Sequence, residues 1–398
     1  MRSLQQQKTI GDLCDFSSGH GFSARDWAEQ GWPIIRIQNL NGSREFNYYE
    51  GETEPDWFVE PGDLLFAWAG TRGVSFGPAI WTGPKGVLNQ HIYKVHPRDG
   101  VDARWLHDAL QVATARIERK AHGFKSTLLH VHKKDITGQR VYAPPLTEQE
   151  NIADTLEVWD RVMSLTERLI AAKLKRRKGL MQQLLTGKRR FPGFGMPRTY
   201  EERVPVDWEF PKTEEVFESY SIKNRPEEPV LSVTQDQGVV RRDSLERLIQ
   251  ADDANVVTYK LIEPGSFVIS LRSFQGGLEF CDIRGLVSPA YHVIRPKRKV
   301  CEDYYRYYFK SPEFIQRLAV AIIGIRDGKQ VSYEDFSFMR IPVPPLQEQR
   351  LIAETLSKQD RELSLLRAQL AALKTQKRGL MQRLLTGKVR VQIADAAA

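Results

Sequence analysis

The segment Phe191–Gly195 has the residue types of a cofactor loop. It reads FPGFG and formally fits the F-x-G-x-G loop that holds S-adenosylmethionine in adenine methyltransferases. That loop should leave a buried strand and open a helix, whereas this segment follows LLTGKRR and runs into MPRTYEERVP. The catalytic [N/D]-P-P-[Y/F] of such enzymes is also absent. We therefore interpret the segment as an interdomain linker.

Two further patterns could in principle hold a metal ion. Pro55-Asp56 with Glu118–Lys120 imitates the PD...ExK arrangement of nucleases, which places carboxylates and a lysine around a metal-activated water. Their wide separation, and the position of Glu118 on a polar helix face, favour solvated structural roles. His130 and His132 alternate as on a strand, without a third ligand at metal spacing. The sequence thus predicts a chain with no catalytic residue and no metal site.

A long internal repeat is the strongest feature of the sequence. Pro144–Arg190 and Pro344–Arg390 align at an offset of 200 with 25 identical residues of 47 and no gap. Both copies open with PPL and EQ and end with GLMQ and LLTGK. The prolines keep the preceding residues extended, and Thr147 with Glu150 forms a capping box, so a helix should begin there. Gly187 and Gly387 should end the two helices.

Apolar residues follow a heptad seam through both copies of the repeat. The seam residues of the first copy are Ile152, Leu156, Trp159, Met163, Ile170, Leu180 and Leu184. Those of the second copy are Ile352, Leu356, Leu363, Leu366, Leu370, Leu373, Leu380 and Leu384. Each helix should be a rod of about 60 Å, because about 40 residues rise 1.5 Å each. We expect the two helices to pack on each other in an antiparallel coiled coil.

The blocks before each helix share a plan but not a sequence. Residues 1–143 and 200–343 both show two strand-like runs around a Glu-Pro-Gly turn, a third strand-like run, a helical segment and a closing Pro-Pro. Identity between the blocks is sparse. The fold is therefore duplicated, and a matched scaffold with a divergent surface is what a reader of two different targets needs.

Charge is concentrated in the repeats. The chain has 398 residues and a net charge of +8, while Lys173–Arg190 carries eight basic residues and no acid, and Leu373–Arg390 carries six. Basic clusters usually contact phosphate, although Lys and Arg near a helix C-terminus also complement the helix dipole. Three widely spaced cysteines support no disulfide framework, and no apolar run approaches the length of a membrane helix. We expect a cytoplasmic protein without membrane contact.

With its two PPL...EQ helices ending in LLTGK, each preceded by a variable block, the chain resembles the specificity subunits of type I restriction-modification systems over essentially its whole length. The resemblance implies an α/β fold in which two pseudo-twofold-related target recognition domains are joined by two long helices packed as an antiparallel coiled coil. The expected boundaries are 1–145 and 191–345 for the recognition domains, the latter with its linker, 146–190 and 346–390 for the helices, and 391–398 for a tail.

The resemblance also implies what the chain does. The expected partners are double-stranded DNA with a bipartite asymmetric site, two methyltransferase (modification) subunits on the helices, and restriction/translocase subunits joined through them. The chain itself is expected to be non-catalytic and to hold no cofactor, while S-adenosylmethionine, ATP and Mg belong to the partners. The alternative is an orphan or differently partnered DNA-binding adaptor of a non-type-I methylation system.

Base readout needs Arg, Lys, Asn, Gln or related side chains on rigid loops that reach groove edges. In the first block the candidates are Arg36, Gln38, Asn39, Trp68, Arg72, Lys125 and Ser126. In the second block they are Arg241, Arg242, Arg272, Gln275, Arg326, Lys329 and Gln330. For each residue a plain surface role is the alternative. The aromatic run Tyr304–Phe309 could stack on an extruded base, but such a run at helical spacing more often packs in a core, and we expect a core role.

Overall fold

The computed structural model describes residues 6–120, 128–199, 203–235, 238–244, 253–269, 277–322 and 333–391. The chain forms two compact units. Unit 1 contains residues 1–167 and 369–398, and unit 2 contains residues 168–368. Each unit therefore combines one α/β domain with half of each long helix.

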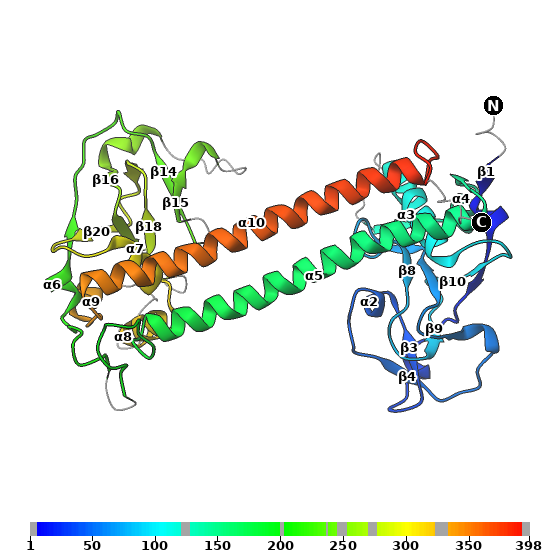
Figure 1. The fold of residues 1–398 in the computed structure, drawn as a ribbon, viewed down its shortest axis with the longest axis horizontal. Helices are drawn as coiled ribbons and strands as arrows, with labels where there is room; N and C mark the ends of the chain where they lie inside the picture. The colour runs from blue at the N-terminus through cyan, green and yellow to red at the C-terminus, as the bar shows by residue number, and fades with distance from the viewer. Residues whose placement is uncertain are drawn as a thin grey trace, which may run out of the picture. The chain divides into compact units, whose positions relative to one another are not determined.

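The elements of unit 1 follow the order that the sequence suggested (Figure 1). The strands are β1 Gln7–Thr9, β2 Cys14–Ser18, β3 Trp32–Ile35, β4 Asn47–Tyr49, β5 Phe58–Val59, β6 Leu64–Ala67, β7 Ala69–Thr71, β8 Gly77–Ile80, β9 Gly86–Leu88, β10 Ile92–Pro97, β11 Leu128–His130 and β12 Arg140–Tyr142. The helices are α1 Ile10–Leu13, η1 Ala24–Asp26, α2 Ile37–Leu40, η2 Pro55–Trp57, α3 Ala103–Lys120, α4 Lys133–Thr137 and α5 Leu146–Leu184, which continues into unit 2.

The elements of unit 2 repeat much of this order. The strands are β13 Phe217–Tyr220, β14 Leu231–Thr234, β15 Gly238–Arg241, β16 Lys260–Ile262, β17 Ser266–Ile269, β18 Glu279–Cys281, β19 Gly285–Val287 and β20 His292–Pro296. The helices are α6 Thr213–Val216, η4 Arg242–Ser244, η5 Asp253–Thr258, α7 Glu302–Tyr308, α8 Pro312–Ile322, α9 Tyr333–Phe338 and α10 Leu346–Leu384, which continues into unit 1.

The main sheets of the two units have the same topology. In unit 1 the order is β2-β10-β6-β8, and in unit 2 it is β13-β20-β17-β18, with every neighbouring pair antiparallel. A second sheet in unit 1 has the order β4-β3-β9-β5. The predicted duplication of the α/β fold is confirmed, because matched strands occupy matched places in each sheet.

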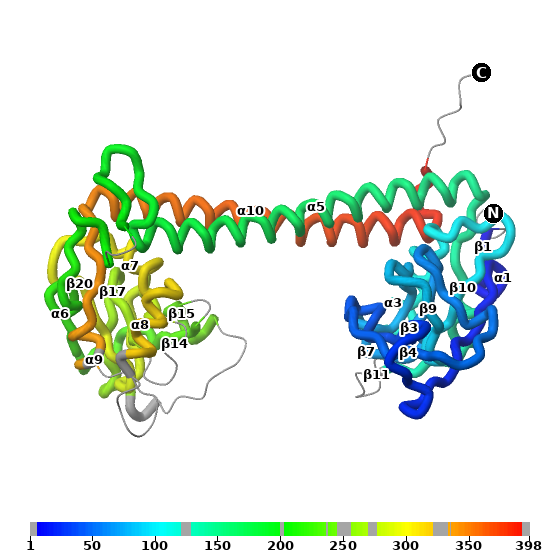
Figure 2. The backbone as a smooth tube through the Cα atoms, turned by 90° about the horizontal axis from the view of Figure 1, so that it is seen from below, coloured from blue at the N-terminus to red at the C-terminus, as the bar shows by residue number. Residues whose placement is uncertain are grey.

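Half of α5 packs antiparallel against half of α10 within each unit, side by side in Figures 1 and 2. Lys377 Nζ lies 2.6 Å from Asp160 Oδ1 in unit 1, and the matched pair in unit 2 is Arg177 with Asp360. These pairs join the start of one helix to the end of the other, which only antiparallel helices allow. The predicted antiparallel coiled coil is thus present.

Three local predictions need correction. Helix α5 begins at Leu146, so Thr147 lies inside the first turn and is not the N-cap. The run IQNL, expected to be extended, forms the helical turn α2, because Asn39 Oδ1 accepts a hydrogen bond from the Arg36 backbone N–H (2.9 Å). The helical segment of block two is broken into α7 and α8, because Pro312 starts a new helix and Ser311 Oγ caps the Phe314 N–H (3.2 Å).

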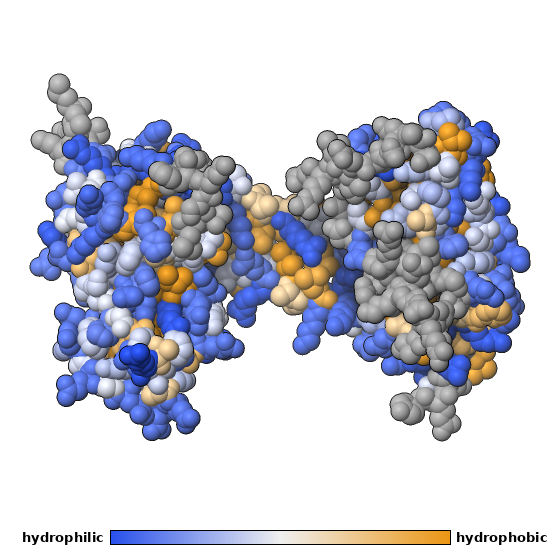
Figure 3. Space-filling view, turned by 180° about the vertical axis from the view of Figure 1, so that it is seen from behind, coloured by the Kyte–Doolittle hydropathy of each residue, from blue (hydrophilic) through white to orange (hydrophobic). Residues whose placement is uncertain are grey.

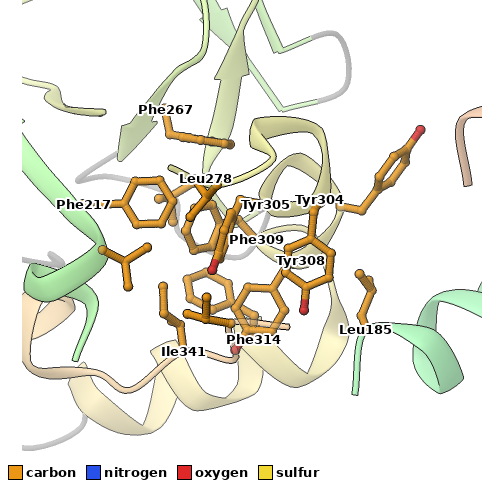
Figure 4. Close-up of a cluster of buried hydrophobic side chains, with 14 of the residues drawn as sticks. Leu185, Phe217, Phe267, Leu278, Tyr304, Tyr305, Tyr308, Phe309, Phe314 and Ile341 are labelled. Carbon is orange, nitrogen blue, oxygen red and sulfur yellow. The ribbon is translucent and has the colours of Figure 1, made fainter. Parts of the chain in front are cut away.

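The aromatic run of block two forms the centre of the unit 2 core, as expected. Tyr304, Tyr305 and Phe309 are fully buried (Figure 4). The rings of Tyr305 and Phe309 pack against Phe217, Phe309 also packs against Phe314, and Tyr304 packs against Tyr305. Burial raises the pKa of Tyr304 and Tyr305 well above the usual value. These side chains therefore hold α7 against the main sheet and are not available to stack on a base.

Candidate nucleic-acid interface

Unit 1 carries an aromatic and polar patch where strands β6 and β9 end. Trp68 follows β6, stacks on Tyr93 with ring centroids 6.0 Å apart, and lies 5.3 Å from His91 and 6.0 Å from His130. Its indole N–H donates to the Gln90 carbonyl oxygen (3.0 Å). Burial raises the pKa of Tyr93. The half-buried Trp68 ring is thus fixed in position beside exposed imidazole edges.

The turn Asn89–His91 forms the polar part of this patch. Asn89 is buried and its N–H donates to the Ile35 carbonyl oxygen (3.0 Å), whereas the Gln90 side chain is exposed. The Gln90 N–H donates to the carbonyl oxygen of His20 (2.9 Å), which brings the exposed His20 beside it. The ring of His20 in turn stacks on Trp57 with centroids 4.0 Å apart.

The name "readout patch" is used here for Trp68, His20, Gln90, His91 and His130. Only Trp68 was among the sequence candidates. The signal for the others was weak: a polar Asn-Gln-His triplet interrupts the apolar run VLNQHIYKV. His20 and His130 lie near that triplet only because of strand pairing. No local pattern in the sequence predicts that proximity.

The first sequence candidates lie in and just before α2, directly after Ile35, whose carbonyl oxygen accepts the Asn89 hydrogen bond. The amide of Asn39 is buried, and its Nδ2 donates to the carbonyl oxygens of Ser43 (3.2 Å) and Glu45 (2.9 Å). The Arg36 guanidinium lies 4.6 Å from the Trp27 ring centroid. Gln38 is exposed. This geometry gives Asn39 a structural role and leaves Gln38 and the half-buried Arg36 as polar groups near the surface.

Arg72 follows β7 in the segment after Trp68. Its guanidinium donates to the carbonyl oxygen of Glu118, and the Gly73 N–H donates to Glu118 Oε1 (2.9 Å). Glu118, which the sequence placed in a nuclease-like PD...ExK pattern, therefore has a structural role in holding this turn. Lys125 and Ser126, also proposed from the sequence, lie outside the described residues.

In unit 2 the described candidates are Arg241 and Arg242. Arg241 ends β15, is exposed, and its Nε lies 3.5 Å from Asp243 Oδ1. Arg242 is half-buried at the start of η4. The other candidates of this block, Arg272, Gln275, Arg326, Lys329 and Gln330, lie outside the described residues.

The seam residues line the inner faces of the long helices. Buried residues of the seam are Ile152, Leu156, Leu184, Ile352, Leu356, Leu363 and Leu384. Partly buried residues of the seam are Trp159, Met163, Ile170, Leu180, Leu366, Leu370, Leu373 and Leu380. Burial is greatest near the helix ends, where the seam also packs against the α/β domain of its unit.

The Glu of each PPL...EQ start pairs with the Arg that ends the other helix. In unit 2, Arg190 donates from Nε and Nη2 to Glu348 (2.9 and 2.7 Å), and these side chains are 2% and 1% exposed. In unit 1 the matched Arg390 donates from Nε to Glu148 (2.6 Å), but Arg390 is 57% exposed. The hydrogen bonds that Arg190 donates to Glu348 raise the pKa of Arg190. We call these pairs the clasps.

The unit 2 clasp is closed by the linker. Arg190 also donates to Asp207 Oδ2 (2.8 Å), and this bond lowers the pKa of Asp207. The indole N–H of Trp208 donates to Glu348 Oε2 (2.9 Å). The FPGFG segment lies within this linker and forms a turn, with no helix opening after it before α6 in the described residues. Its geometry therefore differs from that of a cofactor loop.

The Gln of each PPL...EQ start ties the helix to its α/β domain. Gln149 Oε1 accepts from the Asp102 N–H (3.0 Å) before α3, and the matched Gln349 Oε1 accepts from the Cys301 N–H (2.8 Å) before α7. Their amide nitrogens donate to the carbonyl oxygens of Pro144 (2.8 Å) and Pro344 (2.7 Å). The repeated Gln thus joins each long helix to the domain that precedes it, while the repeated Glu joins it to the end of the other long helix.

Among the described residues, no group of three or more His, Cys, Asp or Glu side chains is arranged to hold a metal ion. The described helices include none that is long and apolar enough to cross a membrane.

Comparison with known proteins agrees with the repeated architecture. Residues 4–176 and 205–375 each match the family described as type I restriction modification DNA specificity domain. The chain is 26% identical over 357 residues to the type I restriction enzyme MjaVIII specificity subunit of Methanocaldococcus jannaschii, covering 85% of this chain and 82% of that protein.

Solved structures give the same fold. The S subunit of a type I restriction-modification system from M. genitalium aligns with a TM-score of 0.53 at 15% identity, covering 95% of both chains. A chain from a structural study of complex assembly and conformational transition of the type I R-M system aligns with a TM-score of 0.60 at 18% identity, covering 96% of this chain and 98% of that chain. The chain, matched by the family in both of its repeats, belongs to the type I restriction-modification specificity subunits.

Proposed function

We propose that each unit reads one half of a split, asymmetric double-stranded DNA site. One observation supports this proposal most directly. The main sheets of the two units have the same strand order, but the turns at matched places carry different side chains. After β9 the turn is Asn89–His91, whereas after the matched β19 it is Ser288–Tyr291. Two equal scaffolds with unequal polar surfaces suit two unequal half-sites.

The readout patch has the chemistry that base edges require. Gln90 carries a donor and an acceptor and can pair with the N6 and N7 of adenine, while each imidazole offers one donor and one acceptor. Trp68 supplies a flat apolar surface whose position is fixed by its bond to the Gln90 carbonyl oxygen. Specificity then arises from a rigid set of side chains on strand ends.

A variant of Gln90 tests this assignment. In a host that expresses the chain with its native partners, Gln90→Ala should broaden one half of the methylated motif and leave the other half unchanged, as read by sequencing of modified bases. His96→Ala is the matched control and should leave both halves of the motif unchanged. His96 is an exposed residue on β10 that is not part of the readout patch, and its ring is hydrogen-bonded to Ser17 Oγ (2.8 Å). An unchanged motif in Gln90→Ala would remove the patch from the reading surface.

The partners in this proposal are two methyltransferase subunits, through which restriction/translocase subunits join. The support is that several repeated residues are exposed and have no packing role to explain their identity. Unit 1 presents Arg161, Ser164, Leu165, Ala371 and Ala372, and unit 2 presents Arg361, Ser364, Leu365, Ala171 and Ala172. Because the helices are antiparallel, each unit carries the same set of five residues: one Arg, one Ser, one Leu and two Ala.

Leu165 and Leu365 are the most informative of these residues. They are matched positions of the repeat and are 54% and 72% exposed, which is unusual for leucine on two independent helices. Figure 3 shows apolar side chains at the surface of the helices. Exposed apolar residues that recur at matched positions favour two equivalent docking surfaces for one kind of partner.

Tagged recovery of the chain from its host, with a solution mass of the complex, tests the partner proposal. We expect two copies of an adenine methyltransferase per chain. Leu165→Asp should remove one copy, Leu365→Asp the other, and the double variant both, while Lys175→Asp at an exposed, unrepeated position should remove neither. Recovery of the chain alone, or as a homodimer, would instead favour an orphan or differently partnered DNA-binding adaptor.

In this proposal the chain supplies recognition and assembly and no catalytic step. S-adenosylmethionine, ATP and Mg then act in the partner subunits. This division fits the side chains described above, since the repeated carboxylates are engaged in clasps and the carboxylate of Glu118 anchors a backbone turn.

A further inference from the structure

Unit 1 contains a basic cleft between α3 and the adjoining halves of α5 and α10. Its volume is about 640 Å³, and its walls carry six cationic side chains. These are Arg72, Arg116, Arg119, Lys374, Lys377 and Arg378. Met163 and Met381 lie deeper in the helix wall, and Glu118 is the one carboxylate in its lining. We call it the α3 cleft.

Hydrogen bonds hold two of the arginines without cancelling their charge. Arg116 Nη1 donates to the carbonyl oxygen of Arg140 (2.6 Å), and Arg119 Nε donates to the carbonyl oxygen of Ala115 (3.2 Å). A carbonyl oxygen orients a guanidinium but carries no net charge. Among the side chains that the structure places, no carboxylate forms an ion pair with Arg116, Arg119 or Arg378. Lys374 and Lys377, by contrast, are paired with Glu167 (2.8 Å) and Asp160 (2.6 Å).

The described part of the matched surface in unit 2 keeps only some of these cations. Arg317 repeats the bond of Arg116, because its Nη2 donates to the carbonyl oxygen of Arg340, the repeat counterpart of Arg140. Three residues further along, the position that matches Arg119 is Val320, which is 70% exposed. The repeat counterpart of Lys374 is Leu174. Among the described residues, Arg317, Arg177 and Lys178 keep the charges of Arg116, Lys377 and Arg378, whereas the counterparts of Arg119 and Lys374 are apolar.

The α3 cleft adjoins the readout patch through one short segment. Trp68 of the patch and Arg72 of the cleft are four residues apart along β7, which is at most about 13 Å of extended chain. In Figure 2, α3 lies between the long helices and strands β7 and β11. The major groove of DNA is about 12 Å wide, which is similar to this upper limit, so a duplex with a base edge at the patch can present its phosphates to the cleft.

We infer that the α3 cleft binds the phosphodiester backbone of the DNA whose half-site unit 1 reads. The inference rests on the proposed function and adds a site to it. Guanidinium groups bind phosphate oxygens in a bidentate manner, and a contact of this kind fixes the register of the duplex without reading its sequence. Unit 1 therefore grips the backbone with a set of cations of which two, Arg119 and Lys374, have apolar counterparts among the described residues of unit 2.

Salt dependence of DNA binding tests the inference. The complex is purified through a tag on this chain, and its affinity for a duplex with the methylated motif and for an unrelated duplex is measured between 50 and 200 mM salt. The variant is Arg119→Ala with Arg378→Ala, two exposed side chains. Loss of two phosphate contacts should lower the salt slope by about 1.8, so that the wild type loses about 12-fold more affinity than the variant over this range.

The outcomes separate this inference from its alternatives. We expect the same change of slope on both duplexes and an unchanged methylated motif. The matched control Lys178→Ala, at the repeat counterpart of Arg378, should keep the wild-type slope. A wild-type slope in the double variant, or a loss confined to the motif duplex, overturns the inference.

Two further results would also overturn it. Competition of free nucleotide with DNA in the wild type, absent in the variant, would make the cleft a nucleotide site. Loss of a co-purified protein with DNA affinity unchanged would make it a protein-docking site. The salt slope on the unrelated duplex tests the cleft even if the wild type shows no preference for the motif. Absence of that preference would refute the proposed function and not the inference about the cleft.

Discussion

The buried clasp of unit 2 predicts an unequal response to two matched substitutions. Arg190→Met removes a guanidinium that is 2% exposed and leaves Glu348, which is 1% exposed, with the Trp208 N–H as its remaining donor. Breaking a buried pair by removing one partner costs about 3–5 kcal/mol, because the remaining charge is buried and uncompensated. Unit 2 should lose stability by that amount.

The matched substitution Arg390→Met should cost much less. Arg390 is 57% exposed, so water already solvates its guanidinium and can replace it beside Glu148. Pairs with an exposed partner contribute about 0–1 kcal/mol. The two copies of the repeat thus provide an internal control. The same Arg–Glu pair occurs in both copies, but its arginine is buried in unit 2 and exposed in unit 1.

Unfolding by urea and by heat measures the difference. Tryptophan fluorescence reports mainly on unit 1, which holds seven of the eight tryptophans, so the unit 2 transition should be followed by calorimetry. Trp208 adds a local signal, because its ring centroid lies 5.7 Å from the Arg190 guanidinium carbon. A loss of 3–5 kcal/mol lowers the melting temperature of a domain of this size by roughly 6–20 °C. Equal losses in the two variants, or a loss below about 1 kcal/mol for Arg190→Met, would refute the reasoning from burial.

Three other predictions, which use four substitutions, follow from single positions. Gln349→Leu leaves the Cys301 N–H and a proline carbonyl without a partner, so unit 2 should lose about 1–3 kcal/mol per group in urea unfolding, and an unchanged midpoint would contradict the assignment. Burial lowers the pKa of His292, so the unfolded chain binds more protons. Stability should therefore fall as pH drops below about 6.5, and His292→Phe should flatten that fall, whereas equal pH profiles would count against it. Gly379→Ala, where an added Cβ meets nothing within 4 Å, should stabilise its helix by about 0.5–1 kcal/mol, while Gly187→Ala, at φ +70°, should destabilise by more than 1 kcal/mol; the reverse order would be inconsistent with the backbone described.

The long helices could be predicted because their signal is local and repeated. Heptad spacing fixes which face is apolar, and glycines mark the ends, so the pairing of the two helices followed from the sequence. The antiparallel direction depends on pairs such as Lys377 with Asp160, which heptad spacing alone does not specify. The helical turn at Ile37–Leu40 was missed because it depends on the side chain of Asn39 capping its own segment.

The readout patch could not be predicted as a group. Its members come from separate strands whose residues are far apart in the sequence, and short strands carry little information about their neighbours. His20 and Gln90 meet because one backbone hydrogen bond joins their segments. The pairing in the clasps could not be predicted for a related reason. Glu148 and Arg390 both lie in the repeated segments, but the sequence does not show that one contacts the other.

The division of each long helix between the units has a consequence for synthesis on the ribosome. Unit 2 is contiguous, from residue 168 to 368, whereas the core of unit 1 joins Ile152 and Leu156 to Leu384 and Leu385. At about 5–20 residues per second, the segment that completes unit 1 emerges roughly 10–40 s after its first part. The domain made first is therefore finished last, and a chain that terminates early leaves the apolar end of α5 uncovered.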